Sequence, residues 1–300
     1  RTPIGTSKRN VLMQAIASWL VARPQNAVMG LAVTLLLPAP QLTSGVIMVL
    51  LVLAQGTKLA VVEGCIAAAV LLTVSLLFGV SITSIASLML GTWLPVFVLA
   101  TLLLRARSLT LVMQVSVILA IVAMLGFFVF VSDPIAFWEP YLAAMAELVE
   151  RNNLQLNTEM LTADVMTVSS VLAFWMLYSV GLLLGYALYR RLPAETQEFG
   201  RFRDLNFGRV IAIAMALASL LAMLLSVAWI QNLAFVMFVF FWLQGLAIVH
   251  WLHAEGVLPM AALIAVYLLL PFLQILLMAL LAVLGYTDAW FDFRRRMKKA

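Results

Sequence analysis

The feature that most constrains this chain is a series of unbroken apolar runs, each close to the length of a membrane-spanning helix. The clearest of them cover residues 59–79, 82–104, 109–131 and 165–189. A helix that crosses the hydrocarbon core of a bilayer needs about twenty apolar residues, whereas a barrel strand needs about ten that alternate with polar ones. Because these runs do not alternate, they predict membrane-spanning α-helices.

Composition excludes a soluble fold for a chain of this size. Hydrophobic residues make up 65% of the 300 residues and charged residues only 10%, whereas soluble domains are about half apolar and a quarter charged. Lipid must therefore solvate much of the chain, and in lipid every backbone polar group needs an internal partner. We expect an all-α, polytopic transmembrane helix bundle that forms a single integral membrane domain over residues 1–300. It should contain about 8–10 membrane segments, short or re-entrant helices included.

Three apolar segments near the N-terminus are too short to cross a bilayer unaided. Residues 11–22 lie between basic residues and predict an interfacial helix within an N-terminal segment of residues 1–25. Residues 26–37 and 42–55 flank a Pro-Ala-Pro sequence. Because two prolines force a turn there, we expect the two arms to form a thin hairpin.

The last third of the chain contains two further spans and one interrupted run. Residues 210–230 and 233–252 should be helices joined by a tight turn at Gln231-Asn232. The final apolar run, 258–284, is broken by Pro271. Because proline cannot sustain the helical hydrogen-bond ladder, this run is either a bent span or a hairpin of two half-helices.

Charge is distributed unevenly along the chain, which has a formal net charge of +5. Residues 133–164 form an acidic loop, residues 190–209 form an arginine-rich connector, and residues 286–300 form a basic amphipathic tail. Cytoplasmic loops of membrane proteins are enriched in Lys and Arg. We therefore expect the connector in the cytoplasm and the acidic loop outside it. The tail lies outside if residues 258–284 are one span, and in the cytoplasm if they are a hairpin.

Polar side chains inside apolar runs are the usual indicators of function in membrane proteins. The ligand-binding candidates on this basis are Gln55, Glu63, Gln114, Gln244 and His250. Glu63 is near a helix start, so it is either a residue favoured there by the helix dipole or a binding or proton-coupling group. The glutamines are either interhelical hydrogen-bonding groups or ligand contacts.

No catalytic or metal-binding signature is present. His250 and His253 lie three residues apart on one helix, but zinc usually takes three or four protein ligands and the chain has no other histidine. The sequence lacks a phosphate-binding glycine loop and a nucleophile–base arrangement. We expect no catalytic residues, no metal, no cofactor and no nucleic-acid partner.

Small residues at helical spacing predict close helix packing. Gly181 and Gly185 form a small-xxx-small motif, and Ala214 and Ala218 offer a similar flat face on a later span. Such residues let helix backbones approach closely. We expect the two faces either to pack on each other or to contact another subunit.

Four strings in the second half of the chain carry a family resemblance. They are GYALYRR at 185–191, EFGRFRDL at 198–205, FWLQGLAIVH at 241–250 and LGYTDAWFDFR at 284–294. Together they resemble the YybS-like predicted membrane proteins of bacteria, a domain of unknown function. That family is grouped remotely with the substrate-binding S components of energy-coupling-factor vitamin transporters. The resemblance implies a compact helical protein of the bacterial cytoplasmic membrane, and it maps no ligand residue onto this chain.

The aromatic and basic ending has two interpretations. Trp290 and Phe291 precede Arg294, Arg295 and Arg296. In one interpretation this is an interfacial helix whose aromatic rings enter the headgroup region while the arginines meet anionic lipid. In the other, the same residues dock on a partner subunit.

Two functions are compatible with these patterns. The first is a small-molecule-binding subunit, related to transporter S components, that works with a partner supplying energy. The second is a structural or regulatory subunit of a larger membrane assembly, or a homo-oligomer. Both predict a multi-pass protein that contacts lipid, and neither requires an enzyme activity.

Overall fold

The computed structural model describes residues 8–152, 162–193, 196–225 and 227–297. In these residues the chain forms thirteen α-helices and one 3₁₀ helix, with no β-strand. Seven of the helices are long and apolar enough to cross a membrane. The expected all-α membrane bundle is confirmed. Parts of the N-terminal segment (1–7), the acidic loop (153–161), the connector (194–195) and the tail (298–300) lie outside the described residues.

The chain divides into two compact units. Unit 1 contains residues 1–112 and 176–200, and unit 2 contains residues 113–175 and 201–300. Helices α6 (Leu109–Phe130) and α8 (Ala163–Tyr189) contribute residues to both.

Unit 1 is built around α3 (Pro40–Gln55), in which every residue from Ser44 to Leu53 is buried. Its neighbours include α2 (Pro24–Leu35) and α4 (Thr57–Leu77). The other helices that belong wholly to unit 1 are α1 (Lys8–Ala22) and α5 (Ile82–Ala106). A helix buried on all sides is expected to be apolar all round, which explains why this segment looked like a membrane arm too short to span.

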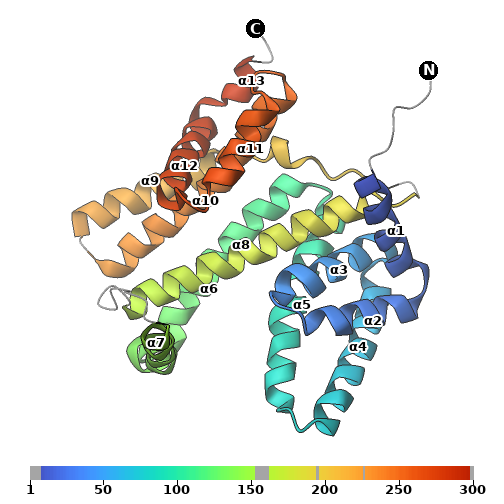
Figure 1. Ribbon diagram of the computed structural model, residues 1–300. Helices are drawn as coiled ribbons and strands as arrows, with labels where there is room; N and C mark the ends of the chain where they lie inside the picture. Colours follow the sequence, from blue (N-terminus) through green and yellow to red (C-terminus); the bar gives the residue numbers. More distant parts are fainter. Residues whose placement is uncertain (1–7, 153–161, 194–195, 226, 298–300) are drawn as a thin grey trace, which may run out of the picture. The chain divides into compact units, whose positions relative to one another are not determined.

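The predicted hairpin of α2 and α3 is confirmed. Pro40 is the first residue of α3, and Ala39 before it adopts a left-handed conformation, with φ 53°. Thr43 fastens the hairpin, because its hydroxyl donates to the Thr34 carbonyl over 2.8 Å. Figure 1 also shows α4 and α5 as a long antiparallel pair.

Unit 2 is built around α10 (Ala228–Ala254). The hydrophobic window of α10 is 67% buried, against 22% to 39% for the other six candidate spans. Its neighbours are α9 (Gly208–Leu225), α12 (Gln274–Phe291) and the 3₁₀ helix η2 (Phe202–Asp204). Figure 1 shows α9 and α10 as a hairpin in light orange.

Two glycines bring α10 and α12 into backbone contact. A Cβ added to Gly245 would meet the backbone of Leu281, and one added to Gly285 would meet the carbonyl oxygen of Phe241. Only glycine permits helix axes to approach this closely. The contact positions polar side chains from the two helices, described below, within reach of each other.

The turn expected at Gln231-Asn232 is wrong. Helix α9 ends at Leu225 and α10 begins at Ala228, so both residues lie in the early turns of α10. The first backbone N–H groups of a helix lack intrahelical partners. Polar side chains are therefore tolerated there, and their presence does not mark the turn itself.

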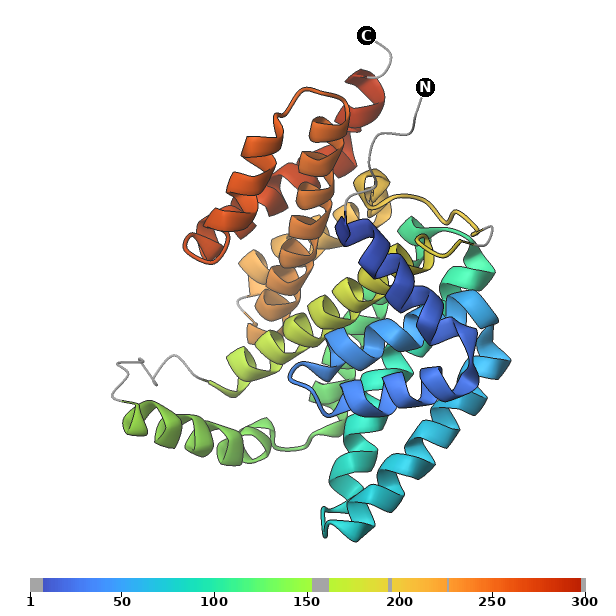
Figure 2. The same ribbon diagram turned by 45° about the vertical axis from the view of Figure 1, so that its right-hand side comes forward.

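The run broken by Pro271 forms two helices, α11 (Met260–Leu269) and α12. Figure 2 shows the chain reversing direction between them, which matches the hairpin alternative. The second arm is longer than expected, because α12 continues to Phe291. The side of the membrane on which the tail lies stays a prediction.

The acidic loop contains a surface helix. Helix α7 (Pro134–Arg151) begins after Asp133, whose carboxylate accepts from the N–H groups of Ile135 and Ala136 at 3.0 Å each. None of its described residues is buried. The tail forms the short helix α13 (Phe293–Met297).

Candidate functional site

A buried polar network lies where α12, α13 and the connector of unit 2 meet. The Arg294 guanidinium forms an ion pair with Asp288, with Nη2 and Oδ2 2.7 Å apart. Gln244 of α10 donates to the same Asp288 oxygen over 3.0 Å. Asp288 and Gln244 are completely buried, and Arg294 is 7% exposed. A buried carboxylate is tolerated only when it is paired and hydrogen-bonded; here Oδ2 meets both conditions, whereas the buried Oδ1 has no partner among the described residues.

The connector supplies the remaining partners of the network. Arg294 donates to the carbonyl oxygens of Arg203 and Leu205, each over 2.8 Å. The Gln244 side-chain oxygen accepts from the Phe207 N–H over 2.7 Å. Gln244 of α10 binds the connector through its side-chain oxygen and Asp288 of α12 through its side-chain nitrogen. It therefore joins α10, α12 and the connector.

A local backbone feature brings Arg294 back to Asp288. Helix α12 ends at Phe291, and the next residue, Asp292, adopts a left-handed conformation with φ 50°. A left-handed residue after the last helical turn reverses the chain direction. Helix α13 therefore begins at Phe293, and Arg294 reaches a carboxylate six positions earlier.

The connector is fixed from a further direction by Gln114 of α6. Its side-chain nitrogen donates to the carbonyl oxygens of Asn206 and Phe207, at 3.0 and 3.1 Å. The carboxamide oxygen of Asn206 accepts from the Gly208 N–H over 2.8 Å. The backbone of residues 205–207, which is neither helix nor sheet, is therefore held in one conformation.

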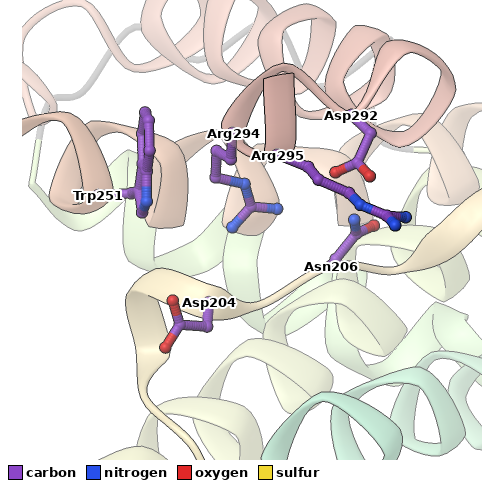
Figure 3. A pocket seen from close by; sticks show the side chains of 6 residues that line it. All are labelled: Asp204, Asn206, Trp251, Asp292, Arg294 and Arg295. Atoms are coloured by element: carbon purple, nitrogen blue, oxygen red, sulfur yellow. The ribbon is translucent and has the colours of Figure 1, made fainter. Parts of the chain in front are cut away.

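An open polar pocket of about 250 Å³ adjoins this network. It lies between the connector, the end of α10 and the junction of α12 with α13 (Figure 3). Its lining residues are polar, charged or amphipathic; they are Asp204, Asn206, Trp251, Asp292, Arg294 and Arg295. Figure 3 shows the Arg295 side chain extending toward Asn206.

Several polar groups of the pocket have no partner within the described part of the chain. Trp251 is 3% exposed, and its indole N–H makes no hydrogen bond there. Arg295, Asp204 and Asp292 form no ion pair with any described residue. The charge of Arg294, by contrast, is neutralised by Asp288. The pocket therefore offers a cation and two carboxylates to a ligand, and one of its lining residues, Trp251, has an indole N–H without a partner in the described residues.

Two of the five candidate ligand residues lie in this network, and none lines the pocket. Gln244 makes an interhelical hydrogen bond to Asp288, and Gln114 binds the backbone of the connector. His250 is 2.7 Å from the Tyr267 hydroxyl. Gln55 and Glu63 belong to unit 1, where the Gln55 nitrogen donates to the Val21 carbonyl over 3.3 Å.

The small-residue motif of α8 packs against α3. A Cβ on Gly181 would lie 3.1 Å from the Gln41 carbonyl oxygen, and one on Gly185 would lie 2.9 Å from that of Val46. This corrects the expected partner, residues 210–230, because α3 occupies the glycine face. On α9, Ala218 is buried and Ala214 is exposed.

The ending separates into buried and exposed parts. Arg294 was expected to meet lipid or a partner, and this is wrong because its guanidinium is enclosed by the network. Arg295 and Arg296 are exposed, as is Phe291, which stacks on Phe293. Trp290 is half-buried and packs edge-on against Tyr286. Lipid or partner contact stays a prediction for the exposed residues.

Sequence reasoning did not assign the central role of Asp288 or the pocket residues Asp204, Asn206, Trp251 and Asp292. One signal was available: an aspartate in an apolar helix, followed within two turns by arginine, predicts a buried ion pair. No three His, Cys, Asp or Glu side chains come together as a metal site in the described residues.

A comparison with protein families gave one match. The family model described as "Predicted membrane protein (DUF2232)" matches residues 139–289. This range includes Gln244 and Asp288 and ends before Arg294. No curated protein and no solved structure matched the chain.

Proposed function

The chain belongs to the family of predicted membrane proteins DUF2232, and from that premise we propose that it is a multi-pass membrane subunit that binds a small polar molecule. The observation that carries the proposal is the pocket of unit 2, which Trp251 lines and in which three charged groups form no ion pair with any described residue. The resemblance of the chain to YybS-like proteins, a family grouped remotely with transporter S components, supports a binding function.

The size of the pocket limits the ligand. Pockets for drug-sized molecules measure about 300–1,000 Å³, and this pocket, at about 250 Å³, is slightly smaller. A single water molecule occupies about 30 Å³ in the liquid. The pocket therefore has room for a small organic solute in place of several waters.

The charges of the pocket indicate what such a solute carries. An anionic group on the ligand would accept from the Arg295 guanidinium and the Trp251 indole. Asn206 could donate as well, because its oxygen is occupied by the Gly208 N–H and its nitrogen is free in the described residues. The carboxylates of Asp204 and Asp292 favour an ammonium or hydroxyl group elsewhere on the same molecule. We propose an amphoteric solute with an anionic group on one side.

The network behind the pocket makes the binding residues rigid. Arg294 is fixed by an ion pair and two carbonyl oxygens, and Arg295 follows it directly. Binding sites built on fixed backbone lose less conformational freedom when the ligand binds. We place the protein in the cytoplasmic membrane of a bacterium, with the connector and the pocket facing the cytoplasm, because the connector is rich in arginine.

Native mass spectrometry of the full chain tests this proposal. The protein is extracted in mild detergent, and any additional mass retained by the folded protein is identified by fragmentation. Losing one charge-assisted hydrogen bond costs about 1.5–3 kcal/mol, so Arg295→Gln should lower occupancy about ten- to a hundredfold. Trp251→Phe should also lower it, because the indole N–H is lost while most of the ring is kept.

Arg296→Gln is the matched control. Arg296 is exposed like Arg295 but does not line the pocket. The control variant should retain the same additional mass as the unmodified protein. Equal occupancy in Arg295→Gln and Arg296→Gln, or no retained mass in any variant, contradicts the proposal.

A structural or regulatory subunit is the second candidate, and α9 favours it. Only 22% of the hydrophobic window of α9 is buried, the smallest share among the seven candidate spans. Its exposed side includes the small residue Ala214 beside large apolar residues such as Leu217. Small residues between large ones suit a second helix. Cross-linking from Ala214→Cys to a stoichiometric membrane partner, with no retained small molecule, would favour this function.

A further inference from the structure

Unit 1 contains a buried carboxyl group that the proposed function does not use. Glu63 of α4 has no exposed surface. It lies on the packed side of the helix, which includes Ala60, Gly64 and Ala67. Gly64 faces α3 so closely that a Cβ there would lie 3.2 Å from the end of Met48. Glu63 therefore points into the helix packing and away from lipid.

The carboxyl oxygens of Glu63 and the side-chain oxygen of Gln55 lack hydrogen-bond donors in the described residues. Neither of its carboxyl oxygens has a partner in the described part of the chain. Gln55 of α3 is the polar side chain that interacts with it. The nitrogen of Gln55 donates to the Val21 carbonyl, while its oxygen is buried and without a partner. Three buried oxygens of these two interacting side chains thus lack a hydrogen-bond donor in the described residues.

No described cation neutralises Glu63. Helices α2 and α3, which pack on α4, contain no charged residue, and α5 contains only Arg105. Arg105, Arg23 at the start of α2 and Lys58 on α4 are all exposed, and none forms an ion pair with Glu63. An ionised carboxylate without a partner in a low-dielectric interior is very costly.

A proton resolves both deficits at once. A protonated carboxyl group gains one O–H donor, and Gln55, whose side chain interacts with Glu63, has a buried oxygen without a partner. We infer that Glu63 and Gln55 form a proton-binding site in the membrane-embedded part of unit 1. In this site the Glu63 O–H donates to the Gln55 side-chain oxygen. Protonation makes the Glu63 side chain neutral, and the hydrogen bond gives both side chains a partner.

A metal ion fits these residues less well. Hard cations such as Ca²⁺ and Mg²⁺ take six or more oxygen ligands, whereas these two side chains supply three oxygens at most.

The proton-binding site is also close to one membrane surface. Glu63 is six residues from the first residue of α4, which is about 9 Å along a helix. A proton can therefore exchange with water near Lys58 over a short path.

Infrared difference spectroscopy of the full chain in lipid nanodiscs tests the inference. The spectrum of the unmodified protein minus that of Glu63→Gln at neutral pH should contain the carbonyl band of one protonated carboxyl group. Gln55→Leu should shift this band, because the hydrogen bond to the amide oxygen is lost. Glu139→Gln, which alters an exposed carboxylate of α7, should leave the band in place.

Two outcomes overturn the inference. One is a carboxylate band from Glu63 at neutral pH in place of the protonated band. The other is a protonated band that sodium ions replace with a carboxylate band at constant pH, which would identify a metal-ion site. Glu63→Gln keeps the size and neutrality of the protonated residue, so it should fold. Circular dichroism of the same samples checks this.

Discussion

Among the described residues, each of the two units buries one carboxyl group completely, and the two groups are stabilised in different ways. Asp288 of unit 2 has an arginine and a glutamine as partners, whereas Glu63 of unit 1 has neither a cation nor a donor in the described residues. In lipid, a carboxylate must find a compensating charge or give up its own. The surroundings, and not the residue type, therefore decide whether a buried acid is structural or available to bind a proton.

The largest effect is expected when the ion pair of unit 2 is broken. Arg294→Met leaves Asp288 buried and unpaired, and such changes cost about 3–5 kcal/mol. The free energy of unfolding, followed by circular dichroism in mixed micelles, measures the loss. Arg296→Met is the control and should change stability by less than about 0.5 kcal/mol, as exposed substitutions usually do.

A double variant tests whether the unpaired Asp288 causes the instability of Arg294→Met. Replacing a whole buried ion pair with apolar residues is often neutral. Asp288→Leu combined with Arg294→Met should therefore recover most of the stability that Arg294→Met loses. If the double variant is as unstable as the sum of its parts, the ion pair is not the source of the effect.

The next largest losses of stability are expected at two glycines that lie against a neighbouring helix, and the loss should be larger in unit 2 than in unit 1. Gly285→Ala places a methyl group on the Phe241 carbonyl, and we expect a cost of about 3 kcal/mol, at the upper end for overpacked sites. Gly185→Ala in unit 1 meets the Val49 side chain as well as backbone and should cost less, about 1–2 kcal/mol.

Gly91→Ala is the matched control for both. Nothing lies within 4 Å of a Cβ at this helical position. Replacing a helical glycine with alanine in open space should stabilise the protein by about 0.5–1 kcal/mol. Melting temperatures of the three variants in one detergent test the order. A loss of stability in Gly91→Ala would show that the close approach of neighbouring atoms is not the cause of the losses at Gly285 and Gly185.

Gln244→Leu should have an intermediate effect in unit 2. The change removes the acceptor of the buried Phe207 N–H and one donor to Asp288. Leaving a buried polar group unsatisfied costs about 1–3 kcal/mol. Gln231→Leu alters an exposed glutamine of the same helix and should be nearly neutral in the same unfolding assay.

The smallest effect at acid pH is expected in unit 1. Glu63→Gln retains a donor for Gln55, so stability should change by less than about 1 kcal/mol near pH 4. Above the ordinary glutamate pKa of about 4.3, the unfolded chain releases a proton that the folded site keeps. Stability of the unmodified protein then falls with rising pH by up to about 1.4 kcal/mol per unit.

Glu63→Gln should remove that decline, so the variant becomes relatively more stable as the pH rises. Unfolding curves between pH 4 and pH 8 measure the difference. A constant difference across this range would mean that Glu63 binds the same number of protons in both states, and the contrast between the two acids would be lost.

Sequence reasoning located most helices accurately. The expected spans 82–104 and 109–131 correspond to α5 and α6, and the expected turn between residues 37 and 42 lies between α2 and α3. These features depend on local apolar length and on proline. The turn at Gln231-Asn232 failed because polar residues mark both turns and the first turns of helices, and spacing alone cannot distinguish them.

The candidate site was only partly predictable. The sequence singled out Gln244 as a ligand-binding candidate, and the structure shows it as a partner of Asp288 and of the connector. The sequence also placed Arg294 against lipid or a partner, although its guanidinium is enclosed by the network. It gave no role to Trp251, which the structure places beside the connector and α13. Each of these errors concerns contacts between segments that are far apart along the chain.

The amino-acid sequence by itself determined that the chain is helical and lies in lipid, because unbroken apolar runs leave no other way to satisfy the backbone. It also determined which polar residues enter that apolar environment. Only the tertiary structure decided which of them are paired, because the close approach of Gly245 and Gly285 and the left-handed Asp292 bring Gln244, Asp288 and Arg294 together. Hydrogen bonds and ion pairs act over a few ångströms, and those distances are set by packing rather than by position in the chain.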